Sequence, residues 1–511
     1  MELLLDKKKS EYMHCFDKGS AIHEEATEII VSDKSPDIEH IVKGVGNVFI
    51  KSKDVRDGKI SVEGTIKGVV LYIASEEKCP RKLDVSIPFF HTFESDGVTP
   101  DSKVLVKAVV RSFDVREMNP RKVSVRASIE LTYRAYNLCE EEICRGVIGA
   151  EKYGVEEKYT NINDYRPIII KEKSFSVNDD IELSGKDTEL SGILTSGVLL
   201  VPGEMKVIGN KAIVKGVCEV NYIYTTEDGV LHSAEHELPF SHILDIDGME
   251  DGHNLEISLE VSGYDLDVSY DASGKARYIT VSVTADISAL VCERTETKAL
   301  CDAYSTSCDA EVSRMEFRSA RYIDKTEKRV PHSETLQLQN GVKKVLDVSV
   351  LPQLPVRRRE NGSEVISSDV VISVMYISED DLLYTASRRA CIVCPVEIKE
   401  NRDYAVATSV RGKGYSQGND KELNVRFFMD FEVTETENEK TSLVCKVETS
   451  EETGDKTRTP SICVMRVSEK CDIWSVAKKH RTRAKEICLA NGIENEEYVD
   501  KGRVLLIPKC R

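Results

Sequence analysis

The chain has 511 residues, of which 41% are hydrophobic and 31% are charged. This balance predicts three or four folded domains with polar surfaces and excludes a disordered chain. The 88 acidic residues outnumber the 70 basic ones and give a formal net charge of −18. The acidic excess argues against sequence-independent binding to nucleic acid, because a phosphate backbone requires clustered Lys and Arg.

The N-terminal segment, 1–27, begins with a run of three leucines, Leu3 to Leu5, that is followed by charged residues. This run is too short for the apolar region of a signal peptide, and no stretch of the chain reaches the ~18 apolar residues of a membrane span. We therefore expect a cytosolic protein. The fifteen cysteines are odd in number and scattered, so we expect reduced thiols rather than a disulfide framework.

The main part of the chain is repetitive. Tyr72, Tyr224 and Tyr376 are separated by 224 − 72 = 152 and 376 − 224 = 152 residues, and each ends an apolar stretch that is followed by an acidic turn. A proline-containing strand and two longer alternating strands come next in each copy. Apolar and polar residues that alternate over seven to nine positions indicate half-buried antiparallel strands.

We therefore predict a mainly β fold with three tandem antiparallel domains, each a sandwich or open barrel. The expected domains span 28–137, 174–293 and 315–434. The expected linkers are 138–173, an acidic segment and candidate helix, then 294–314, and finally 435–460, a Glu-, Thr- and Lys-rich flexible tether.

The C-terminal segment, 461–511, has the pattern of a complete small domain with the order strand, helix, helix, strand. Asp472 is placed to cap the first helix with its carboxylate, and Ile473 and Val476 then fall on one helix face. The pair Asn491-Gly492 is typical of a helix end, where a left-handed residue is needed.

This segment resembles a LysM module, the small βααβ domain whose usual ligand is an N-acetylglucosamine glycan. The family pattern is met at Val467, Ile473, Trp474, Val476, Ala477, His480, Asn491 and 502–508. The resemblance implies a sugar groove between two loops, with candidate glycan residues Cys471, Asn491, Gly492 and Ile493. The first loop, however, reads Lys470-Cys471-Asp472 where glycan-binding members usually have Gly-Asp-Thr/Ser. That departure favours a protein ligand.

A partner surface is therefore expected on the first loop and first helix of the module. Its candidate residues are Lys470, Asp472, Ile473, Trp474 and Lys478. Trp474 is the only tryptophan of the chain, and a core residue of the small domain is the better interpretation of it. The basic residues of the two helices form either a solvated face or a surface for an acidic protein or anionic glycan.

No enzymatic motif has the setting that its chemistry requires. His232 and His236 formally match a zinc motif, but that motif needs a helix, and residues four apart in the strand expected here lie ~13 Å apart. Cys391 and Cys394, three apart on a strand, point to opposite faces. The glycine-rich segment 412–418 lacks the ending of a phosphate loop. We predict no catalytic residue, no metal and no cofactor.

Three tandem β-domains followed by a LysM module resemble the SipL family of clostridial spore-coat morphogenetic proteins, which carry N-terminal repeats of a domain of unknown function. The resemblance implies a non-enzymatic scaffold of the mother-cell cytoplasm, recruited to the forespore surface and needed for spore-coat assembly. It also implies docking through the LysM on the coat-basement ATPase, stage IV sporulation protein A, with the repeats contacting other coat proteins or further copies of the chain. The alternative is a peptidoglycan-binding LysM protein of the cell wall or spore cortex, which requires export.

Overall fold

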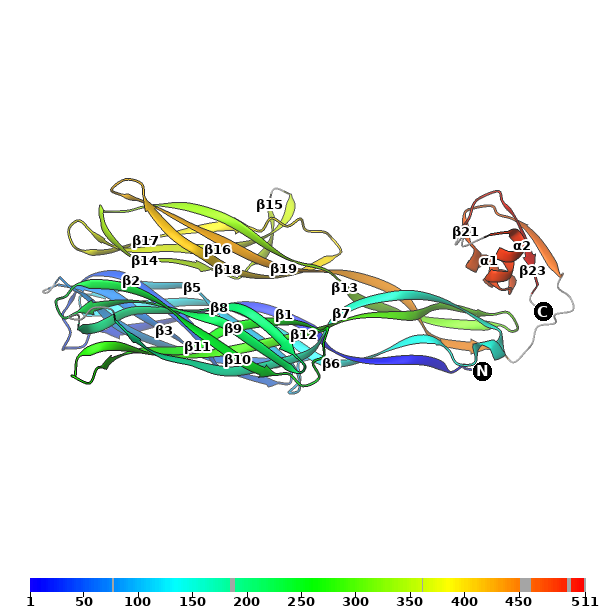
Figure 1. Cartoon of the computed structure of the whole chain (residues 1–511), viewed down its shortest axis with the longest axis horizontal. Coiled ribbons are helices and arrows are strands. Elements are labelled where there is room, and N and C mark those ends of the chain that lie inside the picture. The colour runs from blue at the N-terminus through cyan, green and yellow to red at the C-terminus, as the bar shows by residue number, and fades with distance from the viewer. Residues whose placement is uncertain (76–77, 184–188, 361, 451–460, 494–497, 510–511) are drawn as a thin grey trace.

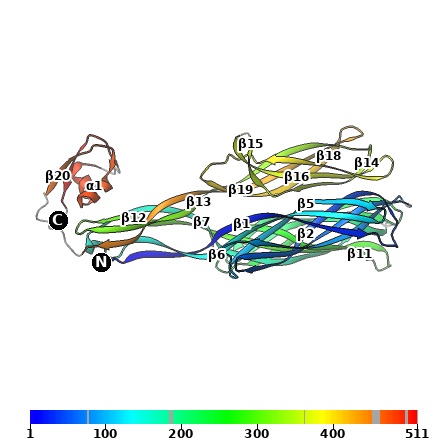
Figure 2. The same ribbon diagram turned by 180° about the vertical axis from the view of Figure 1, so that it is seen from behind.

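The computed structural model describes the chain except for residues 76–77, 184–188, 361, 451–460, 494–497 and 510–511. The molecule is elongated: a head of three β-domains continues into a narrow stalk, and a small helical module lies beside the far end of the stalk (Figure 1). The view from behind shows the same three parts (Figure 2). The N-terminus lies at the stalk end, far from the head.

Each repeat is built from two antiparallel sheets that pack face to face, and in the first two repeats each sheet has three strands. In the first repeat the sheet orders are β1-β6-β5 and β2-β3-β4. The strands of this repeat are β1 (Leu5–Ile30), β2 (Ile38–Arg56), β3 (Lys59–Ala74), β4 (Pro80–Glu94), β5 (Lys103–Asn119) and β6 (Lys122–Val147). Alternate residues of β6, from Val123 to Leu131, are fully buried between the sheets, as period-two patterning requires.

The second repeat has the same two sheets, β11-β12-β7 and β10-β9-β8. Its strands are β7 (Val155–Glu182), β8 (Leu190–Ile208), β9 (Lys211–Thr226), β10 (Leu231–Asp245), β11 (Asn254–Tyr270) and β12 (Ala276–Ser305). The central strands β3 and β9 begin 211 − 59 = 152 residues apart, which is the interval that the tyrosines indicate.

The third repeat departs from the others in one strand, which is split into β14 and β15, both paired with β16. Its strands are β13 (Ala310–Gln337), β14 (Val342–Pro352), β15 (Val356–Glu360), β16 (Ser363–Ser378), β17 (Leu383–Val393), β18 (Arg402–Gln417) and β19 (Glu422–Thr449). The mainly β fold class with tandem antiparallel domains is therefore confirmed.

The three repeats share a core inside the head. Leu71, Ile223 and Met375 occupy the same position of each repeat, 152 residues apart, and all three are buried in one cluster. Polar contacts also cross between repeats, such as that from Lys43 Nζ to Ser373 Oγ at 2.6 Å. The repeats are thus arranged around a common centre rather than strung out in a line.

The stalk occupies the segments that the sequence suggested were linkers. The long strand pairs β1–β6, β7–β12 and β13–β19 run on beyond the head. The expectation of a helix within 138–173 is wrong: this segment is strand, apart from one turn of 3-10 helix at Ala150–Tyr153. The segment 294–314 is mostly β12 and β13, and 435–449 is strand rather than tether. Residues 451–460 lie outside the described residues.

The physical reason for this difference is a core that no single repeat can form. Each strand pair brings only a sparse row of apolar residues among charged ones, and the three rows meet inside the stalk. The shared core includes Cys144, Leu300 and Val444 at one level and Val147, Ala303 and Val447 at the next. A row of this kind, considered in one repeat alone, has nothing to pack against.

The C-terminal module has the expected βααβ order. Its elements are β20 (Ile462–Arg466), β21 (Cys471–Asp472), α1 (Ile473–His480), α2 (Ala484–Asn491), β22 (Tyr498–Val499) and β23 (Val504–Pro508). β20 pairs antiparallel with β23, and α1 and α2 contribute Ile473, Val476 and Ile487 to the core beneath them. Within the described residues, neither helix is long and apolar enough to span a membrane.

Candidate docking interface of the C-terminal module

The first helix of the module lies against the end of the stalk, and a stalk residue completes the core of the module. Tyr304 of β12 is 4% exposed and belongs to the same apolar cluster as Val476 and Ile487. Its ring meets that of Trp474 edge-on, with centroids 4.8 Å apart, and its hydroxyl donates to the carbonyl of Thr482 at 2.7 Å. Trp474 is therefore half-buried at the boundary between module and stalk.

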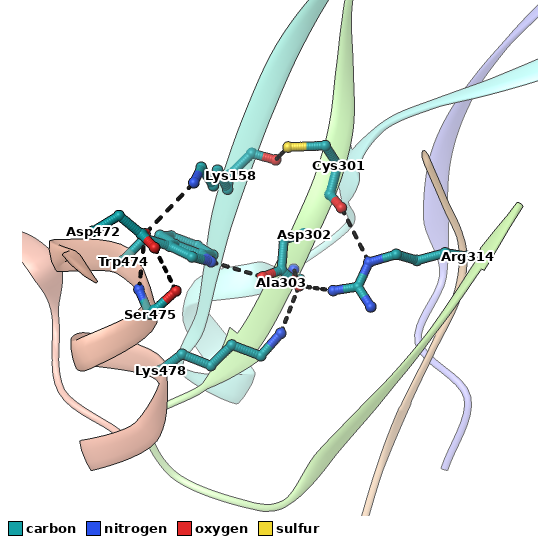
Figure 3. Close-up of polar contacts among 9 residues, drawn as sticks. All are labelled: Lys158, Cys301, Asp302, Ala303, Arg314, Asp472, Trp474, Ser475 and Lys478. Atoms are coloured by element: carbon teal, nitrogen blue, oxygen red, sulfur yellow. Dashed lines mark hydrogen bonds and ion pairs between the residues drawn. The ribbon is translucent and has the colours of Figure 1, made fainter. Parts of the chain in front are cut away.

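Asp302, also on β12, joins the two parts through its carboxylate (Figure 3). Its Oδ2 accepts a hydrogen bond from Trp474 Nε1 at 2.7 Å, and its Oδ1 accepts one from Lys478 Nζ at 2.6 Å. Arg314 of the neighbouring strand β13 pairs with the same carboxylate. Burial alone would raise the pKa of Asp302, but the hydrogen bonds from Lys478 and Trp474 outweigh it, and the pKa lies below its usual value. The carboxylate is thus charged and fully engaged.

Ion pairs surround Asp302, and in most of them the module supplies the basic residue and the stalk supplies the acidic one. On the module, Arg483 Nε lies 3.1 Å from Glu156 Oε1, and Arg481 pairs with Asp309 of the stalk. The module's residues 461–511 carry 11 basic and 7 acidic residues, hence +4, whereas the rest of the chain carries −18 − 4 = −22. Exposed pairs each contribute only about 0–1 kcal/mol, so they orient the module more than they hold it.

The end of the stalk has the same local structure in all three repeats, which makes their residues comparable. Each long strand pair contains a one-residue bulge at the same level. The bulged residues are Arg145, Cys301 and Cys445. The residues one position beyond the bulge are Gly146, Asp302 and Lys446, and those three positions beyond it are Ile148, Tyr304 and Glu448.

Only the second repeat therefore combines an acid and an aromatic ring at the end of its stalk strand. Gly146 and Lys446 cannot accept the hydrogen bonds that Asp302 accepts, and Ile148 and Glu448 cannot supply the ring and hydroxyl of Tyr304. The module faces the one strand pair of the three whose side chains fit it.

The predicted partner residues are divided by the structure. Trp474 and Lys478 face the stalk, as described, and Asp472 caps α1 by accepting from Ser475 N at 3.0 Å, with Lys158 Nζ 3.7 Å from its Oδ1. Ile473 is 3% exposed inside the module, so it has no surface for a partner. Lys470 is exposed, with its Nζ 5.4 Å from the ring centre of Tyr498.

The candidate glycan residues are largely occupied by the module's own backbone. Asn491 Nδ2 donates to the carbonyls of Ile487 and Leu506, each at 2.7 Å, and its Oδ1 accepts from Leu506 N at 2.8 Å. Ile493 is buried, and Gly492 has the positive φ of 60° that ends α2.

The two loops that would wall a sugar groove are joined to each other. Cys471 of the first loop pairs with Val499 of the second through the short strands β21 and β22. Residues 494–497 of the second loop lie outside the described residues.

Sequence reasoning missed Asp302 and Tyr304 because they fall in 294–314, where apolar periodicity is weak. The signal that could have found them is the comparison of repeats: Tyr304 replaces Ile148 and Glu448, and Asp302 replaces Gly146 and Lys446. That comparison requires an alignment of the stalk strands, which the bulges provide and the sequence does not.

The histidine motif lies in an ordinary β-strand. His232 and His236 both belong to β10, where their rings stack on Tyr224 and Tyr222 respectively. In the part of the chain that the structure describes, no group of three or more His, Cys, Asp and Glu side chains could hold a metal ion.

Comparison with known proteins identifies two of the repeats. Residues 37–118 and 192–269 each match the family model described as SipL, SPOCS domain. Each match covers four strands, β2 to β5 and β8 to β11. No curated protein and no solved structure matches the chain. The two matches indicate a sporulation-associated protein.

Proposed function

Because the chain carries the SPOCS domain of the SipL family in two copies, we propose that it is a non-enzymatic scaffold for assembly of the spore coat around the forespore. The observation that carries this proposal is the combination of tandem SPOCS domains with a separate βααβ module at the far end of a stalk. The long stalk separates the recruiting module from the head, so one chain can bind the forespore surface through the module and coat proteins through the head. The scaffold acts in the mother-cell cytoplasm, at the surface of the forespore.

The proposed partner of the module is the coat-basement ATPase, stage IV sporulation protein A. Two features support a protein ligand over a glycan: the first loop of the module departs from the glycan-binding pattern, and the side chain of Asn491 is held by hydrogen bonds to the module's own backbone. The net charge of +4 on the module fits an acidic partner. The alternative, binding of peptidoglycan, is supported less because the candidate groove residues serve the fold of the module.

The head supplies the scaffold's second function. Its three repeats present related surfaces around one centre, so contacts with other coat proteins or with further copies of the chain can be multivalent. Several weak sites on one molecule raise the local concentration of each partner without any strong single contact.

The experiment is a binding assay with two forms of the protein, the full chain and a chain that ends at Ser450 and so keeps the head and stalk. Each is presented with purified stage IV sporulation protein A and, separately, with purified peptidoglycan. We expect the ATPase to bind the full chain and not the shortened one. Saturable binding of peptidoglycan by the full chain, without binding of the ATPase, would contradict the proposal. A Lys51→Glu chain controls for charge, because Lys51 is exposed on β2 in the head, outside the module, and its reversal should leave binding of the ATPase unchanged.

A further inference from the structure

The stalk binds two side chains, Trp474 and Lys478, of the module surface that is proposed to bind the partner. Trp474 Nε1 and Lys478 Nζ both donate to the Asp302 carboxylate, and the ring of Tyr304 packs against the Trp474 ring in a T-shaped contact. A partner that contacts Trp474 and Lys478 must first displace β12. The closed arrangement and the bound arrangement are therefore mutually exclusive.

We propose that the end of the second repeat's stalk is a latch for the chain's own C-terminal module, which Asp302 and Tyr304 hold closed until a partner takes the same face. This inference rests on the proposed function for the identity of the partner, but the latch itself is a property of this chain alone.

The contacts indicate a binding site rather than a chance approach of two surfaces. Tyr304 is nearly fully buried by the module, and the acceptor Asp302 satisfies two donors from one helix. The acid and the aromatic ring occur together in one of three otherwise equivalent strand ends. A surface that touched the module by accident would not differ from its two counterparts in the very residues that make the contact.

The occupant is the module of the same chain, because the described part of the stalk ends where the module docks. Ser450, the last described residue of the stalk, donates its backbone N–H to the carbonyl of Asp309 at 2.9 Å, and the side chain of Asp309 pairs with Arg481 of the module. The ten residues between Ser450 and Ser461 can span at most about 35 Å. A short connection of this kind keeps the module at a high effective concentration near the latch.

The latch is also weak enough to open. Several of its ion pairs are partly exposed: the Lys478, Arg481 and Arg483 side chains are 37%, 45% and 53% accessible. Polar contacts between parts of one chain resemble transient interfaces and allow relative motion. A closed state lowers the apparent affinity for a partner by the fraction of molecules that are open.

Trp474 is the only tryptophan, so its fluorescence reports the latch directly in the full chain. We would compare the wild type, Asp302→Asn, and the control Asp6→Asn. Asp6 is an acid of the first repeat's stalk strands and pairs with Arg145 at 3.1 Å. Asp302→Asn removes the charge that Lys478 and Arg314 share, and loss of a charge-assisted hydrogen bond should raise the open population by about tenfold or more.

The expected result is a red shift of Trp474 emission and stronger quenching by acrylamide in Asp302→Asn, with no change in Asp6→Asn and an unchanged circular dichroism spectrum in both. Sodium chloride at high concentration should shift the wild type in the same direction because it screens the surrounding pairs. Equal quenching in all three chains at all salt concentrations would overturn the latch. Quenching that depends on protein concentration would overturn the assignment to the module of the same chain.

Binding to purified stage IV sporulation protein A then tests exclusivity. Asp302→Asn should bind more tightly than the wild type by the factor that fluorescence gives for the open population, and Asp6→Asn should bind as the wild type does. Equal affinity of an opened Asp302→Asn chain would overturn mutual exclusivity. If none of the three chains bound the ATPase, the proposed function would fail, and the fluorescence measurements would still decide the latch.

Discussion

Substitution of Leu300 by alanine tests the shared core of the stalk. Leu300 is 0% exposed and packs with Cys144 and Val444 from the other two repeats. Truncating a fully buried leucine typically costs about 2–5 kcal/mol, through lost burial and the cavity left behind. Because the stalk is narrow and the head has its own cores, we expect this loss to open the stalk locally rather than to unfold the head.

Hydrogen exchange followed by mass spectrometry measures this opening. A local loss of about 3 kcal/mol should speed amide exchange near Leu300 and in the facing part of β7 by about a hundredfold, at tenfold per ~1.4 kcal/mol. Exchange in β3, β9 and β16 should stay unchanged. The matched control is Leu351→Ala on β14, a leucine that is 58% exposed, which should change exchange little. Unchanged exchange in the stalk of Leu300→Ala would refute the three-repeat core.

Further predictions concern single groups. Asn491→Ala should destabilise the module by about 1–3 kcal/mol because the N–H and carbonyl of Leu506 lose their partner; thermal unfolding followed by Trp474 emission would show a lower midpoint, and an unchanged midpoint would contradict the role. Burial raises the pKa of the Cys218 thiol to about 11, so iodoacetamide at pH 8 should label Cys218 only after denaturation, as peptide mass spectrometry can check. The pKa of Asp302 is lowered in the closed state, so its contribution to docking is present above the usual aspartate pKa and is lost as the pH falls through the lowered pKa. Trp474 emission should therefore shift to the red at that acidic pH and stay unchanged between pH 6 and 8.

The head and the module could be predicted because their signals are local. The 152-residue interval of Tyr72, Tyr224 and Tyr376 marks the ends of β3, β9 and β16, since each repeat buries alternate residues against its own second sheet. In the module, Asp472 caps α1 and Gly492 ends α2, as short-range backbone rules require.

The stalk and the docking interface could not be predicted in the same way. Val147, Ala303 and Val447 are buried in a cluster to which all three repeats contribute, and each stands in a charged segment that has the composition of a solvated linker. Asp302 likewise has the character of a surface acid until the module, 172 residues further along the chain at Trp474, brings two donors to it. Burial created by distant segments leaves no periodicity in the local sequence.

The most direct test of recruitment by the module is the position of fluorescent fusions in sporulating cells. The full chain and the chain that ends at Ser450 would be compared, each expressed in the mother cell in place of the native protein. The scaffold proposal predicts that the full chain surrounds the forespore and that the shortened chain stays diffuse in the mother-cell cytoplasm, with the coat mislocalised. Complete encasement of the forespore by the shortened chain would contradict it.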